Sequence, residues 1–261
     1  MNIVQLSSKE NAHYKHLKKI AASAQARREH AQTLLDGIHL LTALADSHGA
    51  LTDVIVRHGA EHHPEIAQCL TRFPGTRIIL LDEKLYDAIS PVTTPVGIMG
   101  LFSIPKPPLR LHACAVLLEN IQDPGNLGGL LRTAAAAGVG AVFLSAGCTE
   151  AWSPKALRAG MGAHFSLDIH EQQHLPQIAA QYTTSIATQL HAPLSIYDLA
   201  FGDSVAFIFG NEGAGLRTEL ALCATHQVHI PMPGRMESLN VTAAAAICLF
   251  ERVRQLSVHQ G

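Results

Sequence analysis

The sequence predicts an α/β protein made of two domains. At 261 residues the chain is long for a single hydrophobic core, and short apolar runs alternate with helical patterns along much of it. The segment "SIPKPPLRL" at residues 103–111 contains three prolines, so neither helix nor sheet hydrogen bonding can continue through it. We therefore expect a first domain at residues 1–105, a linker at 106–112 and a second domain at 113–261.

The composition is that of a globular protein. Hydrophobic residues make up 48% of the chain and charged residues 15%, which argues against disorder. No stretch has the length of a membrane helix and the polar N-terminus lacks a signal-peptide core, so we expect a cytoplasmic protein without a membrane partner. The five cysteines form no C-x-x-C pair and the histidines form no H-E-x-x-H motif, so we expect neither a disulfide framework nor a metal site.

The first domain is expected to alternate helices and strands. Tyr14, Leu17 and Ile20 recur at helical spacing and predict a helix near residues 10–22. The remaining expected elements are a helix that ends by Gly49, a strand at 53–57, a helix at 64–72, and strands at 76–81 and 96–102.

The N-terminal stretch is basic although the whole chain has a formal charge of -2. Residues 1–30 hold six lysines and arginines against two glutamates. Such a helix could contact RNA phosphates, but a solvated helix face accounts for the same pattern, and the sequence leaves both readings open.

The second domain is expected to contain a mostly parallel sheet covered by helices on both faces, because apolar strands alternate with helices there. The expected strands are 113–120, 140–145, 166–169, 184–188, 205–210 and 226–231, and the expected helices are 126–138, 153–162 and 240–256.

Three of these strands end in loops rich in glycine, proline, asparagine and acidic residues. Ligands of open α/β sheets bind beyond the carboxyl ends of strands, so these loops form the candidate site. In the first loop Asn126 is expected to cap the following helix, and Arg132 lies within about 40° of it around that helix. A capped helix with a surface arginine is the structural alternative.

The second and third loops differ in character. Gly210, Gly213 and Gly215 surround Glu212, and the absence of P-loop or dinucleotide glycine spacing indicates a neutral or cationic ligand rather than a phosphate. In the third loop Ser238 or Asn240 is expected to cap the last helix, whose small residues at 243–246 permit close packing.

Together the three loops resemble the motifs of the SpoU (TrmH-type) RNA 2′-O-ribose methyltransferases of the SPOUT superfamily. The form N-x-x-D-P-x-N-x-G-x-x-x-R spans Asn120 to Arg132, N-E-G-x-G spans Asn211 to Gly215, and I-P-M-x-G-x-x-E-S-L-N spans Ile230 to Asn240. The resemblance covers the second domain. The first domain is similar in outline to the L30e-like substrate-binding domain of many members.

This resemblance implies a deep trefoil knot in the second domain, a homodimer formed through that domain, and S-adenosylmethionine as cofactor. It also implies the site residues. Those expected to hold the cofactor are Gly210, Asn211, Gly213, Ile230, Met232 and Leu239, and those expected at the reaction centre are Asn126, Arg132, Glu212, Ser238 and Asn240.

The implied reaction is methyl transfer to an RNA ribose 2′-hydroxyl, a poor acid whose developing negative charge must be stabilised. An arginine stays protonated, so we expect Arg132 to stabilise that charge rather than act as a free base. Glu212 is expected to accept the proton or to pair with Arg132, while Asn126 and Asn240 orient loops and substrate.

The substrate expected from the two-domain layout and the E-S-L-N ending is 23S-type ribosomal RNA, with transfer RNA as the alternative. Aromatic residues are few, at 5%, so the basic first domain is expected to supply most of the RNA contacts. A non-catalytic RNA-binding protein is the remaining alternative.

Overall fold

The structure is a computed structural model and describes residues 2–258. The chain forms two compact units, one made of Met1–Pro105 with Trp152–Phe165 and the other of Lys106–Ala151 with Ser166–Gly261. Met1 and residues 259–261, which the expected domains include, lie outside the described residues. No helix in the described part of the chain is long and apolar enough to span a membrane.

The N-terminal unit contains a mixed five-stranded sheet with the strand order β1-β4-β3-β5-β2. Its strands β1, β4 and β3 are parallel, whereas β5 runs antiparallel to both β3 and β2. The bounds are β1 Ile3–Leu6, β2 Gln32–Asp36, β3 Asp53–Arg57, β4 Arg77–Leu81 and β5 Ile98–Ser103. Strands β3, β4 and β5 were predicted from the sequence, whereas β1 and β2 were not. β1 is an exposed four-residue edge strand and β2 has only three buried residues, so neither has a long apolar run.

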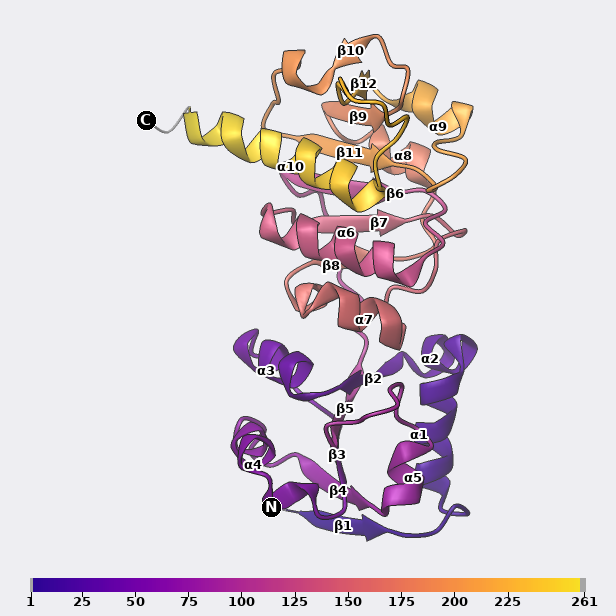
Figure 1. The fold of residues 1–261 in the computed structure, drawn as a ribbon, viewed down its shortest axis with the longest axis vertical. Coiled ribbons are helices and arrows are strands. Elements are labelled where there is room, and N and C mark those ends of the chain that lie inside the picture. The colour runs from indigo at the N-terminus through magenta and orange to yellow at the C-terminus, as the bar shows by residue number, and fades with distance from the viewer. Residues whose placement is uncertain (1, 259–261) are drawn as a thin grey trace. The chain divides into compact units, whose positions relative to one another are not determined.

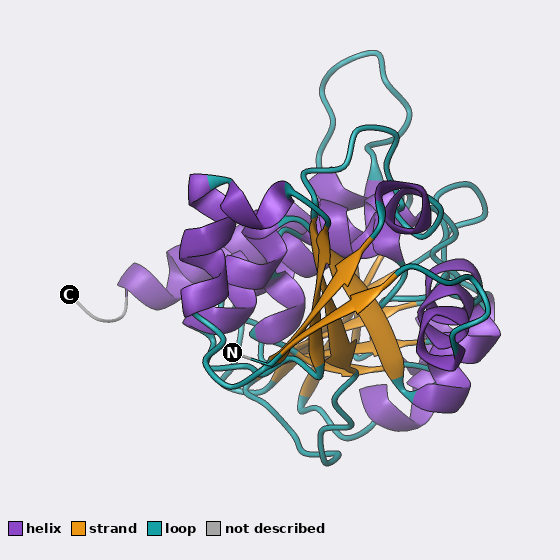
Figure 2. Ribbon diagram, turned by 90° about the horizontal axis from the view of Figure 1, so that it is seen from below, coloured by secondary structure: helices purple, strands orange, loops and turns teal. Residues whose placement is uncertain are grey.

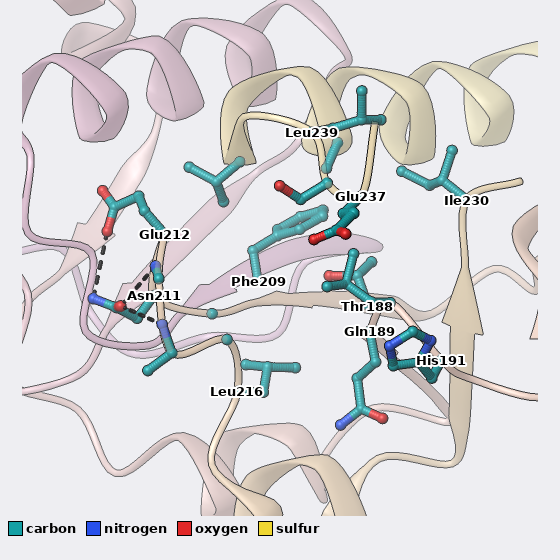
Figure 3. A pocket seen from close by; sticks show the side chains of 18 of the residues that line it. Thr188, Gln189, His191, Phe209, Asn211, Glu212, Leu216, Ile230, Glu237 and Leu239 are labelled. Carbon is teal, nitrogen blue, oxygen red and sulfur yellow. Dashed lines mark hydrogen bonds between the residues drawn. The ribbon is translucent and has the colours of Figure 1, made fainter. Parts of the chain in front are cut away.

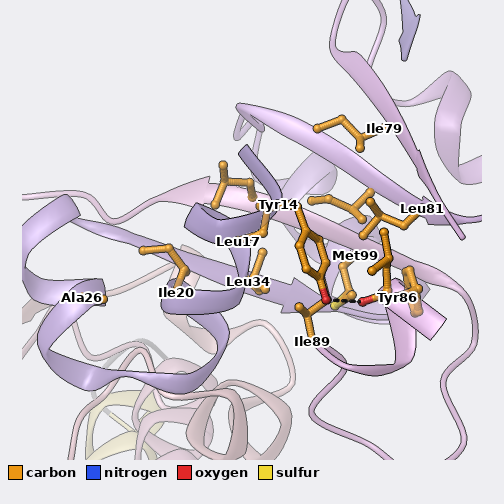
Figure 4. Packing of buried hydrophobic residues seen from close by; sticks show 13 residues of the cluster. Tyr14, Leu17, Ile20, Ala26, Leu34, Ile79, Leu81, Tyr86, Ile89 and Met99 are labelled. Atoms are coloured by element: carbon orange, nitrogen blue, oxygen red, sulfur yellow. Dashed lines mark hydrogen bonds between the residues drawn. The ribbon is translucent and has the colours of Figure 1, made fainter. Parts of the chain in front are cut away.

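The helices of this unit are α1 Ala12–Ala22, α2 Ala24–His30, α3 Ile38–Asp46, α4 Pro64–Thr71 and α5 Glu83–Asp87, with a 3₁₀ turn at Ala60–His62. Asn11 caps α1 by accepting hydrogen bonds from the backbone N–H groups of His13 and Tyr14. Tyr14, Leu17 and Ile20 point into the core, as their spacing predicted, and the Tyr14 hydroxyl donates to the Leu85 carbonyl at 3.2 Å (Figure 4).

A segment from the middle of the chain completes the N-terminal unit, whereas the sequence analysis placed it in the second domain. Trp152–Phe165 contains α7 (Pro154–Gly160) and a 3₁₀ turn at Ala163–Phe165. The Trp152 carbonyl accepts a hydrogen bond from the buried Thr33 hydroxyl at 2.8 Å, and the Trp152 ring lies 5.8 Å from that of Phe102. The N-terminal sheet therefore buries its apolar residues against a helix that follows β7 in the sequence.

The C-terminal unit is built on a seven-stranded sheet with the order β10-β12-β9-β11-β6-β7-β8, in which all paired strands are parallel. Figure 1 shows these strands stacked in this order. Their bounds are β6 Cys114–Leu118, β7 Ala141–Leu144, β8 Asp168–His170, β9 Thr184–Thr188, β10 Leu194–Ser195, β11 Val205–Phe209 and β12 His226–His229. The expected parallel sheet is confirmed, and β10, only two residues long, was missed.

Helices lie on either side of the strands of the protein (Figure 2), and in the C-terminal unit they cover both faces of the sheet. Alternate strand residues, among them Leu117, Phe143 and Ile208, pack against Leu175 of α8 and Leu220 of α9. The opposite face is covered by α6 and α10. The helix bounds are α6 Pro124–Ala136, α8 Leu175–Ala179, α9 Thr218–Cys223 and α10 Val241–Val258, with a 3₁₀ turn at Ile196–Asp198.

The last helix packs closely against α6, as its small residues predicted. A Cβ atom added at Gly129 of α6 would lie 3.0 Å from the methyl group of Thr242 in α10, which leaves little room for a larger side chain. The Thr242 hydroxyl also donates to the Asn126 carbonyl at 3.4 Å. This contact joins the start of α6 to the start of α10, and so brings the first and third loops together.

Candidate active site

The three loops meet because their strands are parallel and end at the same edge of the sheet. Phe209 at the end of β11 is paired with Leu118 at the end of β6, so Gly210 and Glu119 leave the sheet at the same level. We call residues 119–123 the first loop, residues 210–217 the second loop and residues 230–240 the third loop.

The first loop turns into α6 through a cap that differs from the expected one. Asp123, not Asn126, is the N-cap residue: its carboxylate accepts from the Asn126 backbone N–H at 2.9 Å, and Pro124 occupies the first helical position. Asn126 therefore lies within the first turn of α6. Its side-chain amide is left to contact the other two loops.

Asn126 joins all three loops. Its Nδ2 donates to Glu212 Oε1 of the second loop at 3.1 Å, and its Oδ1 accepts from Asn240 Nδ2 of the third loop at 3.0 Å. The expected cap at the last helix is confirmed, because Asn240 Oδ1 accepts from the Thr242 N–H at 2.9 Å. Asn126 and Asn240 thus connect the second and third loops to the start of α6.

Glu212 is fastened to the first loop. Besides the Asn126 amide, its carboxylate accepts from the backbone N–H groups of Gln122 and Asp123, both at 3.3 Å. Burial opposes ionisation of Glu212, but these hydrogen bonds, that of Asn126 foremost, outweigh it and lower the pKa of the carboxyl group. A carboxylate with a lowered pKa and occupied oxygens is a poor proton acceptor, and it forms no ion pair with Arg132 among the described residues.

The second loop is held in shape by the Asn211 side chain and by hydrogen bonds to Glu119 and Asn120, which directly follow β6. Asn211 Oδ1 accepts from the N–H groups of Gly213 and Ala214 at 2.9 Å each, and its Nδ2 donates to the Asn120 carbonyl at 2.8 Å. At the other end of the loop, the buried Glu119 carboxylate accepts from the backbone N–H and the Nε of Arg217, at 2.8 and 2.6 Å. Both ends of the second loop are therefore attached to the first loop, directly after β6.

A cavity of about 500 Å³ lies between the second and third loops and the end of β9 (Figure 3). Its volume falls in the usual range for a small-molecule site. The lining includes every residue that the motifs indicated for a cofactor: Gly210, Asn211, Gly213, Ile230, Met232 and Leu239. Glu212 and Ser238, expected at the reaction centre, line it as well.

Arg132, Asn126 and Asn240 are not part of this lining. Asn126 and Asn240 lie at its border: Asn126 donates to the lining residue Glu212, and Asn240 donates to Asn126. The Arg132 side chain, two turns into α6, is exposed and has no hydrogen bond or ion pair with residues 2–258. Its charge is thus available to a molecule bound from outside.

One group of lining residues lies outside the motifs. Thr188 ends β9, and Gln189 and His191 follow it; β9 lies between β11 and β12. The polar run after β9 could have been found by the rule that sites form beyond strand ends. Glu237, which also lines the cavity, is the glutamate of the I-P-M-x-G-x-x-E-S-L-N motif, but no role was expected for it from the sequence.

Comparison with known proteins gives a consistent answer over the whole chain. The model of the SpoU rRNA Methylase family matches residues 113–250. An uncharacterized tRNA/rRNA methyltransferase of Synechocystis is 34% identical, over 97% of this chain and 95% of its own length. The 23S rRNA (guanosine(2553)-2′-O)-methyltransferase RlmP of Bacillus subtilis is 29% identical, over 94% of this chain and 98% of its own length.

Solved structures agree with this result. The AdoMet-bound rRNA methyltransferase of Sinorhizobium meliloti superimposes with a TM-score of 0.84 at 27% identity, covering 97% of this chain and 98% of its own. A crystal structure of an RNA 2′-O ribose methyltransferase superimposes with a TM-score of 0.80 at 27% identity, covering 97% of this chain and 100% of its own.

Proposed function

The chain belongs to the SpoU rRNA methylase family and is an S-adenosylmethionine-dependent RNA methyltransferase, and we propose that its target is a ribose 2′-hydroxyl of 23S-type ribosomal RNA. The observation that carries this proposal is that Asn126 joins Glu212 of the second loop to Asn240 of the third loop, beside the cavity that these two loops line. Two relatives that match more than nine-tenths of the chain are named as 23S rRNA 2′-O-methyltransferases, one for a guanosine and one for a uridine. The target nucleotide therefore differs between relatives.

The cavity suits S-adenosylmethionine. Apolar side chains such as Leu216, Ile230 and Leu239 can cover an adenine ring, and the glycine-rich second loop offers backbone groups at close range. We assign cofactor binding to Gly210, Asn211, Gly213, Ile230, Met232 and Leu239. The bound cofactor supplies an electrophilic methyl group on a positively charged sulfur.

Arg132 stabilises the negative charge that develops on the ribose oxygen as the 2′-hydroxyl loses its proton. Its guanidinium has no hydrogen-bond or ion-pair partner among the described residues, so the positive charge of the arginine is free for this role. The loops around the reacting groups are held in fixed relative positions by Glu212, Asn126 and Asn240. Ser238, at the rim of the cavity next to Leu239, contacts the substrate ribose.

The N-terminal unit binds the RNA and corresponds to an L30e-like domain. Lys18 and Lys19 of α1 are exposed and have no ion-pair partner among the described residues, as expected for groups that neutralise phosphates. Since Trp152–Phe165 packs within this unit, deletion of residues 1–105 would expose α7 and Trp152. Substitutions in the full chain are therefore a cleaner test of this role than truncation.

The C-terminal unit forms a trefoil knot and a homodimer in this proposal. The chain runs from β12 through the third loop to α10, which packs against α6 and β11. Met236 of the third loop is 75% exposed and Phe250 of α10 is 47% exposed. These apolar side chains, next to the cavity and on the helix that follows it, provide the surface for a second copy. A ribosomal substrate also fits the expected cytoplasmic location.

A comparison of ribosomal RNA from cells with and without the protein tests the substrate. Ribose methylation protects one phosphodiester bond from alkali, so mapping of alkaline cleavage should reveal one site in 23S-type RNA that is lost with the gene. Wild-type protein should restore the mark, and the Arg132→Ala protein should not. A protected site that is lost only from transfer RNA would instead support the tRNA alternative, and unchanged RNA would contradict the proposal.

A further inference from the structure

The cavity between the second and third loops carries an unbalanced negative charge. Its lining contains two carboxylates, Glu212 and Glu237, and no lysine or arginine. His191 is the one histidine among the described residues that line the cavity. A cavity lined in this way attracts a cation and disfavours an anion.

The two carboxylates differ in how far their charge is already neutralised. Glu212 accepts three hydrogen bonds from the first loop and from Asn126. Glu237 has no hydrogen bond or ion pair with any residue between 2 and 258. In Figure 3 its side chain lies amid the lining residues, with the carboxylate on the side of Phe209 and Thr188. Glu237 is thus the carboxylate whose charge remains available to a ligand.

The two ligands of this cavity differ by one charge. S-Adenosylmethionine has a sulfonium, an ammonium and a carboxylate group, and therefore a net charge of one. Methyl transfer breaks the bond between sulfur and the methyl carbon, leaves the electron pair on sulfur, forms the bond to the ribose oxygen and releases the hydroxyl proton to water. The thioether product, S-adenosylhomocysteine, has no net charge.

We propose that Glu237 makes the cavity select the sulfonium cofactor over its thioether product. The carboxylate attracts the positive sulfur before transfer, and this attraction ends when the methyl group leaves, which favours product release. The inference rests on the proposed function of the cavity. Because Glu237 is exposed to solvent, the expected effect is about fivefold in relative affinity, as for a solvent-screened ion pair.

Calorimetric titration of the full-length protein with each ligand tests this inference. Glu237→Gln keeps the shape of the side chain and removes its charge, so it should weaken S-adenosylmethionine binding about fivefold and change S-adenosylhomocysteine binding less than about twofold. The matched control is Glu219→Gln, which removes an exposed carboxylate of α9 outside the cavity and should alter neither affinity. Retained product binding by Glu237→Gln shows that the variant is folded.

Salt provides a second measurement. The preference of the wild-type protein for the sulfonium ligand should fall as ionic strength rises, and that of Glu237→Gln should stay constant. Equal weakening of both ligands, or no change in either, would overturn the inference while leaving the cavity as a cofactor site. A wild-type protein that binds neither ligand would contradict the proposed function, and this inference with it.

Discussion

The backbone of Gly215 passes directly over Gly210 in the second loop. A Cβ atom built at Gly210 would lie 2.4 Å from the Gly215 carbonyl carbon and 2.5 Å from the Leu216 nitrogen. These are backbone atoms, which cannot move aside as a flexible side chain does. The two hydrogen bonds between Asn211 and Gly215, both 3.0 Å, close the loop at this point. The shape of the cavity wall therefore depends on the missing side chain at Gly210.

Gly210→Ala should consequently open the second loop and weaken S-adenosylmethionine binding by at least about tenfold, since overpacking of this kind costs about 1–3 kcal/mol. Calorimetric titration with the cofactor measures the effect. Gly202→Ala is the matched control, because a Cβ atom there would meet nothing closer than 3.8 Å. Equal affinities of the two variants would show that the close approach has no role in binding.

Arg132→Ala should lower kcat by about 100-fold or more, as removal of a charge-stabilising donor does in other enzymes. Because the Arg132 side chain is exposed and unpaired among the described residues, the melting temperature and cofactor affinity should not change. Single-turnover kinetics with saturating RNA separates this effect on chemistry from an effect on RNA binding. Arg132→Lys should recover part of the rate, since it keeps the charge but loses the fork of donors. A normal rate in the alanine variant would remove Arg132 from the reaction.

Glu212→Gln tests whether that carboxylate fastens loops or accepts a proton. In the fastening role the variant should bind the cofactor less tightly but keep most of its rate when saturated, because the amide still accepts a hydrogen bond from Asn126. A loss of rate beyond about 100-fold at saturation would instead identify Glu212 as the proton acceptor.

The pH dependence of folding stability follows from the same carboxylate. The pKa of Glu212 in the folded protein is lowered from its ordinary value of 4.5. Its ionised form therefore stabilises the folded state above that pH, and this contribution is lost as the pH falls through the lower folded value. Urea denaturation at a series of pH values should show a smaller loss of stability on acidification in Glu212→Gln than in the wild-type protein; equal losses would contradict this contribution.

Thr33→Val tests the attachment of the Trp152–Phe165 segment within the N-terminal unit. The substitution removes the donor to the Trp152 carbonyl in a buried position and should lower the free energy of unfolding by about 1–3 kcal/mol. Urea denaturation measures this change. Thr52→Val, at an exposed position, should have little effect. Equal stability of both variants would show that the Thr33 hydrogen bond does not hold the segment.

Charge reversal on α1 tests the RNA-binding role of the N-terminal unit. The double variant Lys18→Glu and Lys19→Glu should raise KM for RNA and reduce the salt dependence of RNA binding, without changing cofactor affinity. Lys106→Glu, an exposed position of the C-terminal unit, is the control. RNA binding that is equally sensitive to both variants would argue for a general charge effect rather than a site on α1.

The sequence predicted the strands and loops of the C-terminal unit well because apolar runs there end in glycine, proline and asparagine. It did not predict which polar groups meet. Asn126 is 86 residues from Glu212 and 114 residues from Asn240, and no local pattern encodes contacts over such separations. The prediction that Asn126 caps α6 was wrong for a local reason. Pro124 occupies the first position of the helix, and Asp123, which directly precedes it, is the N-cap residue.

Two other features depended on tertiary structure. The helical pattern of α7 resembles that of its neighbours, so nothing in residues 154–160 indicates that they pack within the N-terminal unit. Glu237 belongs to the third motif, but nothing in the sequence assigned it a role; the cavity showed which carboxylates line it and which of them lacks a partner among the described residues. The motifs indicated the residues that line the cavity, and the distances between them showed which side chains hold the loops together.

The central claim is most directly tested by methyl transfer with purified protein. Labelled S-adenosylmethionine is supplied with 23S-type ribosomal RNA and, separately, with transfer RNA, both taken from cells that lack the protein. The account predicts label in the ribosomal RNA alone, recovered after alkaline hydrolysis in a single alkali-resistant dinucleotide, and none with the Arg132→Ala variant. Label that alkali releases in mononucleotides, which marks a methylated base, or no label in either RNA, would contradict it.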